Sequence, residues 1–451
     1  MHIRLARPVR LTAFAGLLTG LAGCYENDLA RRVDPLSSGT ANFSRYVAVG
    51  NSLTAGFMDN GLYREGQLNS YPNILAGQFR LANGGTFIQP LFPAEQANGT
   101  GYIKLTSLPT QTSGGLPVTA QVAPQAVRSL ANGRPLLTKF TSYPNDNLGV
   151  PGIRMSDINT PGYGTAQGNP FFERLLPDNS TQTYLQYVSN QISGASFFSS
   201  WMGNNDALQY ALSGGSVPFT PTPLFTANNN ALLDLLGSGG RKGVVIGIPK
   251  ILAAPYFNTV TLAQVLTRVN AALQAAQPGA PTVTALVIRS TLAPQGIRAT
   301  KAGDLLLLAQ QADYANIGRT DVGTRQGAYG LSLTNPIADG SVLDAEEAAA
   351  LNAKIDEYNG VLKAAADARN LAWVDINTLI TQLGSGTFTS NGTSFGLSFI
   401  SGGTVSLDGI HFTPAGHALV ANEILKSLRA KYNVQLPDVD ASRYRKVLVQ
   451  P

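Results

Sequence analysis

The chain has 451 residues, enough to bury a sizeable core in one large domain or two smaller ones. Only 13% of them are charged, while Gly, Pro, Ser, Thr and Asn are abundant, which favours an extracytoplasmic protein with long loops. The formal net charge of +5 falls to +2 once Arg4, Arg7 and Arg10 leave with an N-terminal leader. So small a positive excess argues against a nucleic acid as the partner.

The leader has a basic stretch through Arg10, an apolar stretch over residues 11–21, and small residues before Cys24. Because the apolar stretch is too short to span a bilayer, we predict that residues 1–23 are a signal peptide. Cys24 is the only cysteine, so an intramolecular disulfide is excluded.

The four residues Leu21-Ala22-Gly23-Cys24 resemble the lipobox of bacterial lipoproteins. The resemblance implies that Cys24 is acylated and anchors the protein in the cell envelope, on the periplasmic or surface face of the outer membrane. An ordinary signal peptide followed by an incidental thiol is the alternative. Residues 24–43 are then the lipidated cysteine and a polar tether.

The first apolar run after the tether, Tyr46 to Gly50, breaks on glycine and leads into Asn51-Ser52. This pattern predicts a buried strand followed by a tight turn. Similar apolar runs that end in turn residues follow at 195–199, 243–248, 283–288 and 371–376.

Two helical patterns lie among these runs. The first covers 344–369, where Asp344 and Glu347 have the spacing of a capping box. The second begins after Thr413, a good N-cap residue followed by Pro414, and runs to about Arg429. Strands that alternate with helices predict a parallel sheet covered on both faces.

The remaining segments are long and rich in Gly, Ser, Thr, Asn and Pro. We interpret them as insertions that decorate a single domain over residues 44–435, and residues 436–451 as a C-terminal tail. The insertions are expected at about 83–145, 160–182, 212–240 and 380–404.

Histidine is scarce: apart from His2 in the leader, only His411 and His417 remain as bases. Asp408 precedes His411 by three residues in a loop, so its carboxylate can reach Nδ1 and leave Nε2 free as a base. An accidental neighbour is the alternative. His417 falls one turn into the predicted helix without such a carboxylate, and we expect it to face solvent or to cap.

Ser52 lies at a strand-to-helix turn, where a serine can simply cap the helix. The same turn also suits a nucleophile. The hydroxyl projects at the C-terminal edge of the sheet, and the helix N-terminus supplies N–H groups and positive potential for a developing oxyanion.

Four short blocks in order resemble those of the SGNH (GDSL-like) serine hydrolases. They are Gly50-Asn51-Ser52-Leu53, Asn147-Leu148-Gly149-Val150-Pro151-Gly152, Gly203-Asn204-Asn205-Asp206 and Asp408-Gly409-Ile410-His411. The resemblance covers about Tyr46 to Leu428 and implies a three-layer α/β/α flavodoxin-like fold with a parallel central sheet and long loop insertions. It implies five site residues. Ser52 is the nucleophile, His411 is its base with Asp408 as the carboxylate beside it, and Gly152 and Asn205 donate hydrogen bonds to the oxyanion.

One position departs from the family pattern: Asn51 replaces an aspartate. Asparagine can still accept the hydrogen bonds that the short aspartate side chain would accept, so we expect activity to survive, at an altered level or pH dependence.

Trp201 and Phe412 flank the site in sequence, although core packing explains them equally well. Asp375, at the end of a predicted strand, has no second carboxylate positioned with it.

The resemblance implies a lipid-anchored enzyme that cleaves carboxylic esters through an acyl-enzyme, with neither a metal nor an organic cofactor. The expected partners are an ester substrate, which is an acylated lipid, a polysaccharide or a small ester, and the membrane through Cys24. A catalytically silent glycan- or lipid-binding lipoprotein on the same scaffold is the rival interpretation, because a fold does not dictate a function. Acyl transfer to an alcohol is a third.

Overall fold

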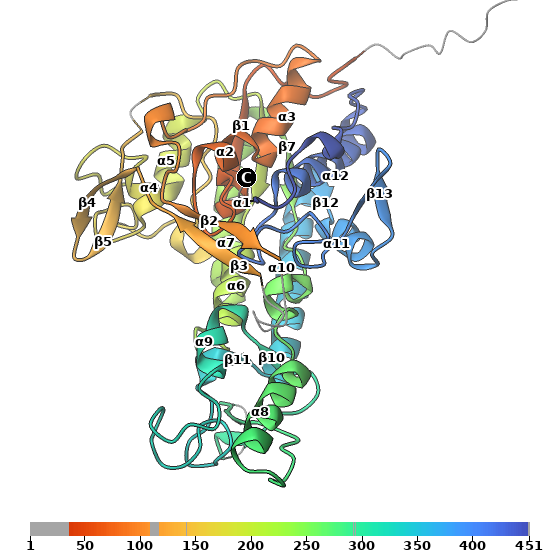
Figure 1. The fold of residues 1–451 in the computed structure, drawn as a ribbon. Helices are drawn as coiled ribbons and strands as arrows, with labels where there is room; N and C mark the ends of the chain where they lie inside the picture. The colour runs from red at the N-terminus through yellow and green to blue at the C-terminus, as the bar shows by residue number, and fades with distance from the viewer. Residues whose placement is uncertain (1–35, 109–116, 141, 292, 294, 450–451) are drawn as a thin grey trace, which may run out of the picture. The chain divides into compact units, whose positions relative to one another are not determined.

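The centre of the protein is a parallel sheet of four strands in the order β1–β6–β7–β12 (Figure 1). The computed structural model describes residues 36–108, 117–140, 142–291, 293 and 295–449. The predicted signal peptide, Cys24 and most of the tether therefore lie outside the described residues. The strands comprise β1 (Tyr46–Gly50), β6 (Phe197–Trp201), β7 (Lys242–Ile246) and β12 (Ala372–Val374).

Residues 147–150 extend the sheet beyond β1. The N–H of Leu148 donates to the Ala48 carbonyl at 2.8 Å, and the N–H of Val150 donates to the Gly50 carbonyl at 3.0 Å. Gly50 also pairs with Trp201 on the other side of β1. Three consecutive segments of the sheet thus finish at the same edge, and each continues into one of the sequence blocks.

Helices cover both faces of the sheet, which confirms the predicted three-layer α/β/α fold. Successive β1 residues alternate between the two cores: Val47 and Val49 face one, Tyr46 and Ala48 the other. This alternation follows from the two-residue period of a strand. One core is completed by α5 (Tyr184–Gln191), α6 (Asn204–Leu212), α7 (Thr222–Leu236) and α10 (Ala345–Ala368), and the other by α3 (Tyr71–Arg80), α11 (Ile376–Gly384) and α12 (Pro414–Tyr432).

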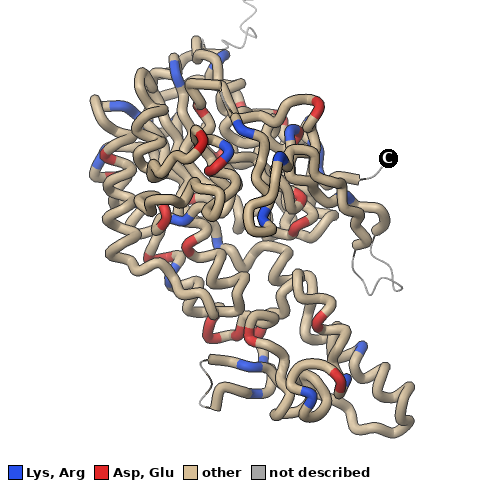
Figure 2. The backbone as a smooth tube through the Cα atoms, turned by 90° about the vertical axis from the view of Figure 1, so that its left-hand side faces the viewer, with Lys and Arg blue, Asp and Glu red and all other residues tan. Residues whose placement is uncertain are grey.

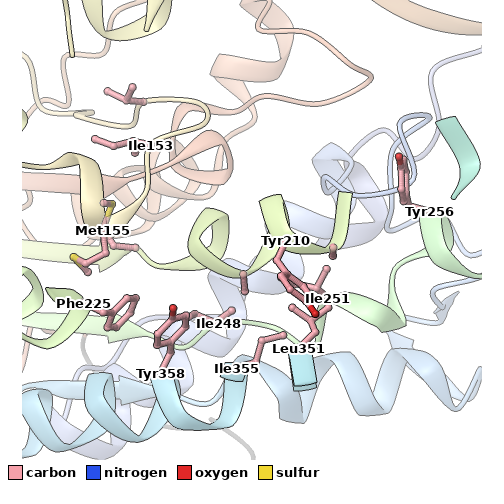
Figure 3. Packing of buried hydrophobic residues seen from close by; sticks show 14 of the residues in the cluster. Ile153, Met155, Tyr210, Phe225, Ile248, Ile251, Tyr256, Leu351, Ile355 and Tyr358 are labelled. Atoms are coloured by element: carbon pink, nitrogen blue, oxygen red, sulfur yellow. The ribbon is translucent and has the colours of Figure 1, made fainter. Parts of the chain in front are cut away.

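Both predicted helices form with the expected N-terminal caps. Asp344 accepts from the Glu347 N–H and Glu347 accepts from the Asp344 N–H, each at 2.9 Å, so the capping box that starts α10 is complete. Thr413 accepts from the N–H of Gly416 at 3.1 Å, with Pro414 in the first turn of α12. In the core beside α10, Phe225 stacks on Tyr358 with ring centroids 4.1 Å apart (Figure 3).

The remaining strands form antiparallel pairs. These are β2 (Tyr102–Ser107) with β3 (Val118–Val122), β4 (Val127–Ala131) with β5 (Arg134–Leu137), β8 (Val287–Arg289) with β9 (Ile297–Ala299), β10 (Leu305–Leu306) with β11 (Val342–Leu343), and β13 (Phe388–Ser390) with β14 (Thr393–Phe395). The short helices are α1 (Ser52–Ala55), α2 (Arg64–Leu68), α4 (Pro170–Glu173) and α9 (Gln311–Tyr314).

The predicted strand at 283–288 was wrong as a member of the central sheet. Only Val287 to Arg289 are extended as β8, and they pair with β9 in a separate hairpin. An apolar run reports burial but not the strand with which it pairs. The hairpin belongs to the stretch between β7 and α10, which also holds α8 (Leu262–Ala276) and which the sequence patterns did not separate (Figure 1).

The polar segment 212–240, expected as an insertion, contains the 15-residue helix α7. Its run Asn228-Asn229-Asn230 interrupts the apolar pattern, yet Leu232, Leu233 and Leu236 are fully buried. The proposed bounds of the insertions and of the C-terminal tail stay predictions.

Acidic and basic residues are interspersed along the backbone in the view of Figure 2. Within the described ranges, the structure has no helix with the length and apolar character needed to cross a membrane.

The pH dependence of stability is expected to depend on Glu347. Burial, with the nearby carboxylates of Asp344 and Asp339, raises the pKa of Glu347 to about 7, from an ordinary value of 4.5. The folded protein therefore holds a proton that the unfolded chain has already lost. The resulting stabilisation is complete below about pH 4.5 and is lost as the pH rises through about 7.

We predict that Glu347→Gln, which keeps a capping-box acceptor, flattens this dependence. Between about pH 5 and 8, the free energy of unfolding of the wild type should fall by about 1–3 kcal/mol more than that of the variant. Urea unfolding at a series of pH values measures both. Parallel curves for the two proteins would show that Glu347 does not titrate in this range.

Candidate active site

Ser52 is the first residue of α1 and is separated from the end of β1 by Asn51 alone. The preceding Asn51 caps this helix, because its Oδ1 accepts from the N–H of Leu53 at 3.1 Å. The substitution of aspartate by Asn51 thus keeps the acceptor, as expected. The N–H groups of a first helical turn have no partner within the helix, so the backbone around Ser52 offers donors at the sheet edge.

The Ser52 side chain meets His411, 359 positions further along the chain. Its Oγ lies 2.9 Å from Nε2 of His411, and Nδ1 of the same ring lies 2.9 Å from Oδ2 of Asp408. The structure therefore brings together the serine, histidine and aspartate that the sequence singled out. The side chains of Asp408 and His411 are 10% and 14% exposed, so solvent screens these contacts little.

The loop that carries Asp408 and His411 is a tight hairpin joined by the Ser406 N–H to the His411 carbonyl, at 2.8 Å. Its turn requires glycine at position 409, where φ is +77° and a Cβ atom would lie 3.0 Å from the backbone nitrogen of Tyr256. Tyr256 also donates its N–H to the Gly409 carbonyl at 3.0 Å. The residues after β7 thus hold the tip of the hairpin.

Hydrogen bonds keep Asp408 ionised. Burial alone would raise its pKa, but the imidazole of His411 and the backbone N–H groups of His411 and Asn60 lower it well below the usual range. Oδ1 accepts from the N–H groups of Ile410 and His411, each at 2.9 Å. Oδ2 accepts from the N–H of Asn60 at 3.0 Å. The carboxylate can therefore hold a histidine cation beside it.

The Asn60 donor comes from a two-residue turn that our sequence interpretation missed. Asp59 and Asn60 have φ values of 52° and 61°, and Met58 pairs with Gly61 on either side of them. A turn with two positive φ values favours Asn, Asp and Gly, so Asp59-Asn60-Gly61 was the available signal. The Asp59 carboxylate also accepts from the N–H of Leu407 at 3.0 Å, next to Asp408.

Asp59 is fully buried and forms an ion pair with Arg445, near the C-terminal end of the chain. Arg445 lies 3.5 Å from it, donates to Tyr63 Oη at 2.9 Å, and donates to Glu65 at 2.7 Å. Burial raises the pKa of Asp59, and the guanidinium of Arg445 opposes that rise. The segment predicted as a tail thus contributes to the support of the Asp408 loop.

Gly152 and Asn205 lie at the same edge of the sheet. Gly152 has a φ of +83° in the turn after residues 147–150, and Asn205 lies in the first turn of α6. Together with Ser52 and His411 they line one cavity of about 1210 Å³. The Asn205 amide donates to the Ile153 carbonyl at 2.9 Å, which ties α6 to the loop of Gly152.

Asp206 supports the Gly152 loop further. Its carboxylate accepts from the N–H of Met155 at 2.6 Å and from the N–H of Ser156 at 3.3 Å. Burial raises the pKa of Asp206 to about 6. The last residue of this block is thus a structural acceptor behind the site.

The expectation that His417 faces solvent or caps its helix was wrong. The residue is fully buried, its Nδ1 accepts from the N–H of Tyr71 at 3.3 Å, and burial lowers its pKa to about 3. The reason is that α12 is buried on almost every side at its N-terminal end. His417 is therefore a neutral core residue.

Trp201, Phe412 and Asp375, for which the sequence left a structural alternative open, have structural roles. Trp201 is fully buried and donates from Nε1 to the Gly247 carbonyl at 2.8 Å, and Phe412 is 4% exposed. Asp375 caps α11 by accepting from the N–H of Asn377 at 3.1 Å. The described part of the chain contains no group of three or more side chains that could hold a metal ion.

A serine and a histidine that meet at the carboxyl edge of a parallel sheet are an arrangement that suits a serine hydrolase. The family model of the GDSL-like lipase/acylhydrolases matches residues 314–424, which include the Asp408 and His411 loop. Over these residues the chain is similar to this family, and the match supports an enzyme that hydrolyses esters.

Several solved structures are similar at low identity. An alpha/beta hydrolase from the metagenome of Lake Arreo has 12% identity and a TM-score of 0.35, over 86% of this chain and 96% of the other. An acetyl xylan esterase from Geobacillus stearothermophilus has 10% identity and a TM-score of 0.35, over 86% of this chain and 95% of the other. An extracellular lipase from Streptomyces rimosus has 13% identity and a TM-score of 0.31, over 86% of this chain and 98% of the other. Similarity at this level does not transfer the substrate of any of them. No curated protein matches the sequence.

The support of the Asp408 loop by Asp59 and Arg445 can be measured in a double-mutant cycle. We predict that Arg445→Met lowers both the free energy of unfolding and kcat, because it leaves Asp59 buried without its cation. In combination with Asp59→Asn it should cost less than the two single changes together, with a coupling of about 1–3 kcal/mol. Urea unfolding of the four proteins gives this value.

The matched control is Arg443→Met, two positions away. The Arg443 side chain is 83% exposed and is paired only with Asp440, so its loss should change the free energy of unfolding by about 0.5 kcal/mol or less. Strict additivity of the Asp59 and Arg445 changes would mean that the pair does not support the loop.

Proposed function

We propose that the protein hydrolyses carboxylic esters through an acyl-enzyme, with Ser52 as the nucleophile, His411 as the base and Asp408 as its orienting carboxylate. The observation that carries this proposal is the unbroken chain of two 2.9 Å contacts from Ser52 Oγ through the His411 ring to Asp408. A serine hydroxyl needs an adjacent base to attack an ester, and the base needs a third group to fix its tautomer.

In the first half of the reaction, His411 Nε2 takes the Ser52 proton while Oγ bonds to the ester carbonyl carbon. The carbonyl oxygen becomes negatively charged, and the backbone N–H groups of Ser52 and Gly152 with the Asn205 amide stabilise it. His411 then gives its proton to the leaving alcohol oxygen as the carbon–oxygen bond breaks. Asp408 stabilises the imidazolium between these two proton transfers.

In the second half, water replaces the alcohol. His411 takes a proton from the water as it attacks the acyl group on Ser52, and returns that proton to Ser52 Oγ when the acid leaves. Every proton removed is returned, so the cycle needs no co-reactant beyond water.

We predict that Ser52→Ala and His411→Ala each lower kcat for a short acyl ester by about 10⁴-fold or more. Initial rates with an acetyl ester measure the loss, and circular dichroism confirms that the variants fold. Ser401→Ala, which alters an exposed serine close to the Asp408 loop in sequence, is the matched control and should keep the wild-type rate. Full activity in either the Ser52 or the His411 variant would refute the assignment.

We propose also that Cys24 is acylated and holds the enzyme on a membrane of the bacterial envelope, with the outer membrane as the favoured location. The support is the lipobox-like Leu21-Ala22-Gly23-Cys24 at the end of a signal-peptide pattern. Several acyl chains on one residue would hold the protein firmly on the membrane, because each methylene buried in the bilayer contributes about 0.8 kcal/mol to membrane binding.

For the anchor, we predict that the full chain, expressed in a bacterium that processes lipoproteins, incorporates labelled palmitate and fractionates with membranes. Cys24→Ser should remove the label and release the protein into the soluble fraction. A wild-type protein that is secreted without label would exclude the anchor, and so would a Cys24→Ser variant that still carries it.

A further inference from the structure

Two cavities meet at Ser52, and their walls differ in chemistry. Both are lined by Ser52, Asn205, Leu208 and His411. One extends from there to Gly152 and the residues around Asn169, and is called here the outer cavity. The other extends between the loop after β7, helix α11 and the residues just before the Asp408 hairpin, and is called here the inner pocket.

The inner pocket is mostly aliphatic away from the reacting groups, with Asn204 and Lys250 as polar exceptions. The space between its walls is about 620 Å³, part of which is open to solvent. Its walls include Ile251, Ala253, Ile380, Leu397, Val405 and Ile410. Three of these, Ile251, Ile380 and Val405, are less than a tenth exposed, so core side chains form much of the pocket wall.

The outer cavity is larger, at about 1210 Å³, and more polar. The side chains of Arg134, Gln167, Asn169 and Gln209 line it beside aromatic rings. A polar alcohol keeps hydrogen-bonding partners in such a cavity, whereas in the inner pocket it would lose water without replacement.

We propose that the inner pocket binds the acyl chain of the substrate and selects unbranched aliphatic chains longer than acetyl, while the outer cavity takes the alcohol. This inference rests on the proposed function, since it assumes that the ester carbonyl lies at Ser52. Each methylene moved from water into the pocket favours binding, and full burial of one corresponds to about a fourfold gain. An acetyl group would leave the pocket empty.

The first test is a series of p-nitrophenyl esters from acetyl to decanoyl on the mature wild-type enzyme. The value of kcat/KM should rise by about two- to fourfold per methylene up to octanoyl. Ile380→Trp and Leu397→Trp fill the pocket from α11 and from the following loop, and each should lower the octanoyl-to-acetyl ratio at least tenfold. Leu333→Trp, at an exposed position, is the control whose ratio should match the wild type.

The second test separates the pocket from the chemistry. Decanoate should bind Ser52→Ala protein in a titration calorimeter at least tenfold more tightly than acetate, and the Leu397→Trp change should remove the difference. Turnover of acetyl esters with a flat chain-length profile would overturn the pocket and leave Ser52 catalysis intact. If no ester is turned over but decanoate binds as expected, the proposed function fails and the pocket stands. Equal binding of the two acids would overturn the inference.

Discussion

The 2.9 Å contact between Ser52 Oγ and His411 Nε2 depends on where the strands of the central sheet end. Because the sheet is parallel, β1, β6 and residues 147–150 run in the same direction and finish at one edge. The serine, the glycine and the asparagine follow these three ends. Residues far apart in the chain meet there because a parallel sheet places the carboxyl ends of its strands together.

The histidine and the aspartate reach this edge differently. They follow no strand of the sheet and instead occupy a hairpin held by its neighbours: Tyr256 at the tip, and the turn of Asp59 and Asn60 along the side. Arg445 then neutralises the buried Asp59 from the end of the chain. The geometry of one hydrogen-bonded pair thus depends on contacts from three distant segments.

The buried carboxyl groups at the carboxyl edge of the sheet differ in pKa because their partners differ. Asp408 accepts three backbone N–H groups beside a histidine, and these partners outweigh burial, so its pKa lies well below the usual range. Asp206 also accepts backbone N–H groups, but burial outweighs them and raises its pKa to about 6. His417 has only one weak partner and stays neutral. Burial therefore acts on all three groups, but only at Asp408 do the hydrogen-bonding and charged partners outweigh it.

Much of the fold could be predicted from the sequence, since the strands and the two capped helices carry local signals; the five candidate site residues lie at one edge of the sheet, and their roles stay predictions. Asp344 with Glu347 and Thr413 with Pro414 marked their helices because caps involve neighbours in the chain. The strand at 283–288 was misplaced because its partner, β9, is not encoded in its own residues. His417 was misjudged for the same reason, since its burial and its hydrogen bond with Tyr71 depend on segments hundreds of residues away.

The roles assigned to the site residues have a direct chemical test. A fluorophosphonate reacts with a serine only where a base and an oxyanion site activate it. Mass spectrometry of the labelled, digested protein should find one adduct, on the peptide that contains Ser52, and none after His411→Ala. Failure of the wild-type protein to react, or an adduct on another residue, would contradict the account.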